Sequence, residues 1–136
     1  MLDDRDHGHP VLARPISFDQ LIDEVSTFLP RYLIACRGQD PLVEIDPGLT
    51  KLHQRNARRY AQVYPESLCF QFAEQALWLP KANRIALIAH EIGHLIDTGS
   101  EAAADRAAWR VLGIRIAYDK RWPGKGLQSV AHDLGA

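Results

Sequence analysis

Two histidines and a glutamate near the middle of the chain have the types and the spacing of a catalytic metal site. The sequence there is His90-Glu91-Ile92-Gly93-His94, an H-E-x-x-H pattern. On a helix, residues four positions apart lie on one face, one turn from each other. Two imidazoles in that arrangement can bind one zinc ion, which takes nitrogen ligands at ~2.0–2.1 Å.

Glu91 is the residue that adds reactivity to this pattern. It follows His90 directly, so its side chain leaves the helix about 100° around the axis. The carboxylate is then expected beside the metal, where it can take a proton from a water molecule and deliver it to a leaving amine. The pattern predicts zinc-dependent hydrolysis of peptide bonds, with His90 and His94 as metal ligands and Glu91 as the catalytic base and acid.

A catalytic zinc site also needs a third protein ligand and an open position. The spacing favours Glu101, because it follows His94 by seven residues and begins the next predicted helix. A tight turn over 97–100 would fold that helix back and direct Glu101 at the metal. Asp97 and Asp105 are the alternative ligands. If Asp105 is not a ligand, it lies one turn beyond Glu101, where it can accept a hydrogen bond from a ligand histidine and orient that ring.

The elements that must position these residues are predicted from apolar periodicity and turn residues. A capping pattern at Ser17 starts a helix that ends near Phe28 or Leu29, before Pro30. Strands are expected over 41–45, 60–64, 68–72 and 76–79, and helices over 81–97, 101–112 and 127–134. Together these elements predict an α+β fold with an N-terminal helix, a small antiparallel sheet, the H-E-x-x-H helix and a following glutamate helix.

Gly93 stands inside the predicted motif helix, where glycine costs ~1 kcal/mol relative to alanine. Its presence predicts that a neighbouring element packs closely against the helix at this point. The strand expected over 76–79 is the candidate edge at which a peptide substrate adds as a further strand. The residue that stabilises the oxyanion of the reaction is left open, and the C-terminal candidates are Arg115, Tyr118, Lys120 and His132.

The H-E-x-x-H stretch, followed by Glu101 and then Asp105, resembles the gluzincin metallopeptidases. In that family an H-E-x-x-H helix precedes a helix with the pattern E-x-x-x-D. The compact members, the minigluzincins, are most similar, with an N-terminal helix, a small sheet whose edge strand holds an extended substrate, and two metal helices. The resemblance is sharp over residues 85–112. It implies that His90, His94 and Glu101 bind zinc, that Glu91 is base and acid, and that Asp105 orients a ligand.

Two other interpretations compete with an enzyme. The chain can be a zinc-containing regulatory or binding module of the same fold with little or no proteolytic activity. Glu91 argues against this, because a structural zinc site fills its fourth position with a ligand and does not need this glutamate. A nucleic-acid-binding protein that uses the basic segment over 50–59 is the other alternative. The formal net charge of −1 disfavours it.

Length and composition limit the remaining possibilities. The 136 residues fit one zincin-like domain over 16–136, preceded by a flexible N-terminal arm over 1–15. With a net charge of −1, neither nucleic acid nor a membrane is expected as partner. We expect a peptide or protein substrate, and the oligomeric state is left open. The N-terminus lacks the basic start and apolar stretch of a secretory signal, so a cytoplasmic location is expected.

Overall fold

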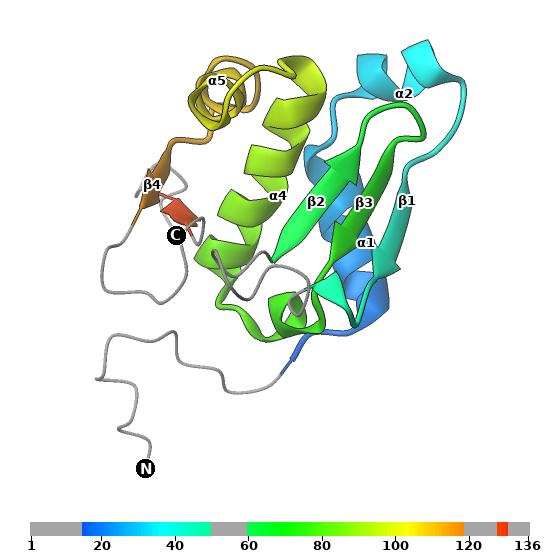
Figure 1. Ribbon diagram of the computed structural model, residues 1–136, viewed down its shortest axis with the longest axis vertical. Coiled ribbons are helices and arrows are strands. Elements are labelled where there is room, and N and C mark those ends of the chain that lie inside the picture. The colour runs from blue at the N-terminus through cyan, green and yellow to red at the C-terminus, as the bar shows by residue number, and fades with distance from the viewer. Residues whose placement is uncertain (1–14, 50–59, 119–127, 131–136) are drawn as a thin grey trace.

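The computed structural model describes residues 15–49, 60–118 and 128–130, which form an α+β fold (Figure 1). The helices are α1 (Phe18–Phe28), α2 (Arg31–Arg37), α4 (Lys81–Ile96) and α5 (Glu101–Ala107). A 3₁₀ turn lies at Glu74–Trp78, and α5 continues into a π-helical turn at Ala108–Leu112. The strands are β1 (Leu42–Ile45), β2 (Ala61–Tyr64), β3 (Cys69–Phe72), β4 (Ile116–Tyr118) and β5 (Gln128–Val130).

The first three strands form a mixed sheet in the order β1-β3-β2. β2 and β3 are antiparallel because a short turn joins them, whereas β1 runs parallel to β3. The prediction of a purely antiparallel sheet is therefore wrong. A tight turn imposes antiparallel pairing only on the strands that it connects, and β1 reaches β3 through a long connection that includes β2.

One face of this sheet forms the core of the molecule. Phe70 and Phe72 of β3 are fully buried, and Ala61 of β2 lies on the same face. They pack in one cluster with α1 and α4, whose contributing buried residues are Leu21, Val25, Leu87, Ile88, Ile92 and Leu95. Figure 1 shows β2 as the strand of this sheet that lies beside α4. The sheet and α4 are thus held together by apolar burial along β2.

The opposite face of the sheet carries polar side chains that bond across all three strands. The Gln71 side-chain amide donates to Glu44 Oε1 (3.0 Å). The Gln62 amide donates to Gln71 Oε1 (2.7 Å) and to the Tyr64 hydroxyl (3.0 Å). These cross-strand bonds hold β2 in register beside β3.

The N-terminal helix begins and ends as predicted. The Ser17 hydroxyl accepts a hydrogen bond from the Gln20 backbone N–H (3.0 Å), and α1 ends at Phe28 before Pro30. The guanidinium of Arg84 then joins α1 to the first turns of α4. Its Nε and Nη2 donate to the two carboxylate oxygens of Glu24, each at 2.7 Å. This paired contact sets the position of α4 against α1.

Two short predictions are wrong. Residues 76–78 of the expected strand over 76–79 lie in the 3₁₀ turn, in which the Ala76 N–H donates to the Ala73 carbonyl (2.9 Å), and Leu79 is its C-cap. A run of four consecutive apolar residues does not distinguish a strand from a tight helical turn. The expected helix over 127–134 contains β5, which pairs with β4. The basic segment over 50–59 and all but Pro15 of the predicted N-terminal arm lie outside the described residues.

Among residues 15–49, 60–118 and 128–130, no helix is both long enough and apolar enough to span a membrane.

Candidate metal centre

The helix α4 carries both histidines of the motif and is buried over most of its length. After it ends, Asp97 Oδ1 accepts a hydrogen bond from the Gly99 N–H (3.1 Å). The Ser100 hydroxyl then caps α5 by accepting from the Ala103 N–H (3.1 Å). The predicted tight turn over 97–100 is confirmed, and it places α5 across the last turns of α4 (Figure 1).

At Gly93 the backbones of α4 and α5 approach each other closely. A Cβ atom at this position would lie 2.1 Å from the Ala104 carbonyl oxygen and 2.8 Å from its carbonyl carbon. No side chain fits there, since even a methyl group would overlap the backbone of α5. The prediction of a close neighbouring element is confirmed, and that element is the glutamate helix.

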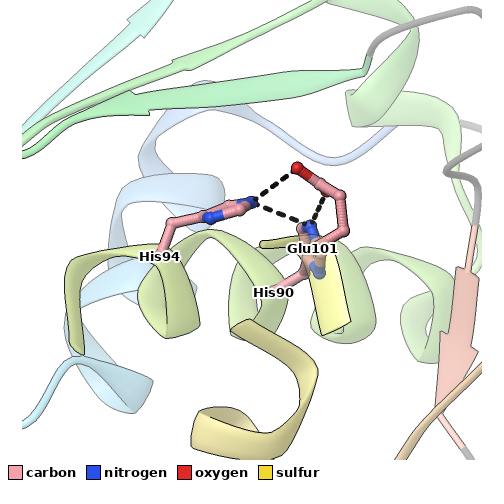
Figure 2. A group of neighbouring side chains, drawn as sticks. All are labelled: His90, His94 and Glu101. Carbon is pink, nitrogen blue, oxygen red and sulfur yellow. Dashed lines mark hydrogen bonds and ion pairs between the residues drawn. The ribbon is translucent and has the colours of Figure 1, made fainter. Parts of the chain in front are cut away.

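The crossing of α4 and α5 brings three side chains together (Figure 2). His90 Nε2 lies 2.7 Å from Glu101 Oε1, and His94 Nε2 lies 3.3 Å from Glu101 Oε2. The two Nε2 atoms are 3.1 Å apart. These ligand atoms all lie within 4.8 Å of one another, so the group can hold a metal ion.

The donor types of this group, two imidazoles and a carboxylate, are those that zinc sites use. Zinc bonds of ~2.0–2.1 Å at tetrahedral angles place neighbouring ligand atoms about 3.3 Å apart. The observed distances between the ligand atoms of His90, His94 and Glu101 are 2.7, 3.1 and 3.3 Å, so the closest pair, at hydrogen-bond distance, would move apart to hold zinc. Within the part of the chain that the structure describes, the group has three members, which leaves a fourth position of a tetrahedral site open, as catalytic sites require.

The aspartates are placed differently from Glu101. Asp105 Oδ1 lies 2.7 Å from His90 Nδ1, on the other side of the ring from the cluster. A carboxylate only accepts, so Nδ1 carries a proton and Nε2 is left as the nitrogen that can bind a metal. Asp97, in contrast, accepts from a backbone N–H in the turn. Of the three candidates for a third ligand, the structure therefore brings Glu101 to both Nε2 atoms.

The charges of the cluster shift the affinity of both rings for protons. Burial lowers the pKa of His90, but the hydrogen bond to Asp105 and the charges of Glu91 and Asp105 outweigh it and raise the pKa to about 8. The pKa of His94 is lowered, first by burial and then by the neighbouring His90. The pKa of Glu101 is lowered, because the two histidines outweigh the effect of burial.

Metal binding should therefore weaken at acidic pH. A metal must displace the proton from His90 Nε2, so its affinity should fall about tenfold for each pH unit below the pKa of about 8. Zinc titrations against a competing chelator between about pH 6 and pH 9 would measure this slope. In Asp105→Asn the onset should move to lower pH, because the carboxylate that raises the pKa is lost. A pH-independent affinity below pH 8 would contradict this prediction.

Glu91 lies at the same site, inside a pocket of about 290 Å³ between α4 and β2. Glu91 is only 5% exposed. The residues that line the pocket are Gln62, Val63, Pro65, Glu91, His94, Thr98 and Glu101. The strand beside the site is therefore β2. The segment over 76–79 was predicted to be the strand edge that binds the substrate, and this prediction is wrong because the segment is not a strand. The alternation of residues over 60–64 predicts that this segment is a strand, but not that the strand lies beside the site.

The C-terminal oxyanion candidates are not decided by the described residues. The guanidinium of Arg115 lies over the ring of Trp109, 4.4 Å from its centroid. The side chain of Tyr118, and Lys120 and His132 as a whole, lie outside the part that the structure describes.

Comparison with known proteins leaves the site to be interpreted from its own residues. The chain matches no family model, no curated protein and no solved structure.

Proposed function

We propose that this protein is a zinc metallopeptidase, a compact enzyme of the gluzincin type. The observation that carries the proposal is the convergence of His90 Nε2, His94 Nε2 and the Glu101 carboxylate beside the buried Glu91. This set has the ligand types, the spacing and the adjacent carboxylate that peptide hydrolysis needs. A purely structural zinc site, with all four positions filled by ligands, would account for the three ligands but not for the presence of Glu91 beside them.

In the proposed reaction, His90, His94 and Glu101 would hold a zinc ion, which when bound would lower the pKa of a water molecule toward ~7 and polarise the scissile carbonyl. Glu91 accepts the proton that this water loses and then donates it to the leaving amine. Its burial keeps bulk water away and strengthens its interactions with nearby charges. Asp105 holds the ring of His90 in the orientation that presents Nε2.

The peptide itself would bind beside β2. This strand pairs only with β3 among the strands that the structure describes, and Val63 lines the pocket next to Glu91 and His94. An extended peptide can add to such an edge through backbone hydrogen bonds, which bind many sequences with little dependence on side chains. The pocket would then hold the part of the peptide next to the cleaved bond, either one of its side chains or its main chain.

Removal of Glu101 tests the metal centre and the activity together. Purified protein should contain near-stoichiometric zinc, and Glu101→Ala should bind zinc about a hundredfold more weakly, since apparent affinities of about 10–16 kcal/mol are shared among about four ligands. Metal analysis would measure the bound zinc, and cleavage of a mixture of unstructured peptides would measure the activity. The matched control is Glu74→Ala, which removes an exposed glutamate outside the pocket.

Two results would redirect the proposal. Zinc content that is unchanged in Glu101→Ala would exclude this residue as a ligand. Zinc that is bound as expected, with no peptide cleavage in the wild-type protein, would favour the zinc-containing regulatory or binding module instead.

A further inference from the structure

β2 has one edge that no described strand pairs with, here called its free edge, and its backbone offers hydrogen-bonding groups there at alternate residues only. The Ala73 N–H donates to the Tyr60 carbonyl (2.8 Å), and the register pairs Gln62 with Gln71. In an antiparallel pair, every second residue bonds to the partner strand. Gln62 and Tyr64 therefore bond to β3, while the N–H and C=O groups of Ala61 and Val63 point away from β3, toward the free edge.

Pro65 ends this edge abruptly. It occupies the next outward position after Val63, but proline has no N–H to donate. Its carbonyl accepts from the Leu68 N–H (3.3 Å) and closes the turn between β2 and β3. Leu68 is fully buried with a φ of 53°, so the turn is held in place by the core. Strand pairing is thus available along Ala61 and Val63 and stops at Pro65.

The candidate pocket lies at this end of the strand. Gln62, Val63 and Pro65 line it together with Glu91 and His94. A peptide bond over the site would therefore have strand-pairing positions on one side, toward Ala61, and the proline turn on the other. Antiparallel addition is the more stable mode, and it would run the peptide from its amino end near Pro65 to its carboxyl end near Ala61.

We propose that the site selects peptides through the residues on the carboxyl side of the cleaved bond, which pair with Ala61 and Val63, and requires no backbone pairing on the amino side. This inference rests on the proposed peptidase function and specifies its substrate class: extended chains held downstream of the bond, including chains with only a short segment before it. The edge of β2 sets the direction in which the peptide binds, and the side chains of the peptide add sequence preference.

Single backbone N-methylations of one cleaved peptide test this asymmetry. The probe is an unstructured synthetic peptide that zinc-loaded wild-type protein cleaves and Glu91→Gln does not. On the carboxyl side, methylation at alternate residues should lower kcat/KM about fivefold to tenfold, the effect of losing one backbone hydrogen bond. On the amino side, beyond the residue at the cleaved bond, methylation should change kcat/KM less than about twofold.

A Pro65→Ala variant supplies the missing N–H and should create sensitivity to methylation on the amino side. The comparison is made between peptides on one variant, so a change in the folded fraction cancels. Pro47→Ala, at an exposed proline away from the pocket, should leave the wild-type pattern.

The outcomes separate this inference from the function on which it rests. Glu91-dependent cleavage with equal sensitivity on both sides, or with the asymmetry reversed, would overturn the inference and leave the peptidase intact. An unchanged pattern in Pro65→Ala would overturn the role of Pro65. No Glu91-dependent cleavage of any peptide would remove both proposals.

Discussion

Glu91→Gln should retain zinc while peptide hydrolysis falls by about 10²–10⁴-fold, the usual contribution of a positioned general acid–base. Glutamine has nearly the same shape as glutamate, so the packing of a residue that is 5% exposed is preserved. An amide does not take up a proton near neutral pH, so the water is not activated and the leaving amine is not protonated. Because Glu91 is proposed to act on the water and not to bind the metal, the zinc content should stay unchanged.

Metal analysis, thermal unfolding and peptide cleavage should be measured on the same preparation. Glu74→Gln, which makes the same substitution at an exposed position outside the pocket, should match wild type in all three. Full cleavage by Glu91→Gln would exclude Glu91 as the base. Loss of zinc together with activity would instead assign Glu91 to the metal-binding group.

Gly93→Ala should destabilise the protein by about 2 kcal/mol, with overpacking that costs about 3 kcal/mol and helix propensity that returns ~1 kcal/mol. The added Cβ would lie 2.1 Å from the Ala104 carbonyl oxygen. The atoms that it meets are backbone, so no side-chain rotation relieves the overlap and α5 must move. Glu101 and Asp105 both lie on α5, so zinc binding should weaken as well.

Denaturant unfolding of the metal-free protein and a zinc titration would measure these two effects. Gly48→Ala is the matched control, because a Cβ there meets only Asp46 Oδ1 at 3.5 Å, an ordinary contact. Its stability should change by less than about 0.5 kcal/mol. A Gly93→Ala protein with unchanged or increased stability would show that α4 and α5 are not packed this closely.

The helices illustrate which parts of this fold are predictable from local sequence. α1 begins at the Ser17 cap and ends before Pro30, and α4 spans Lys81–Ile96 against an expected 81–97. Caps, helical periodicity and proline all act over a few neighbouring residues, so their effects do not depend on the rest of the chain.

The strands illustrate the opposite case. Most of the run over 76–79 lies in a 3₁₀ turn at Glu74–Trp78, and a segment expected to be helical contains β5. β1 was expected in an antiparallel sheet and runs parallel to β3. A strand is stabilised by partners that are distant in the sequence, so its partner, its direction and even its existence depend on the tertiary structure.

The candidate site combines both kinds of information. The sequence alone placed His90 and His94 one helical turn apart with Glu91 beside them, because the helical repeat is a local property. It favoured Glu101 as the third member, with Asp97 and Asp105 as alternatives, and it selected the wrong segment as the substrate edge. Only the packing of α5 across Gly93 brings Glu101 to both Nε2 atoms, and only the sheet order places β2 beside the pocket. Both depend on how distant segments pack, and no repeat within one segment encodes that.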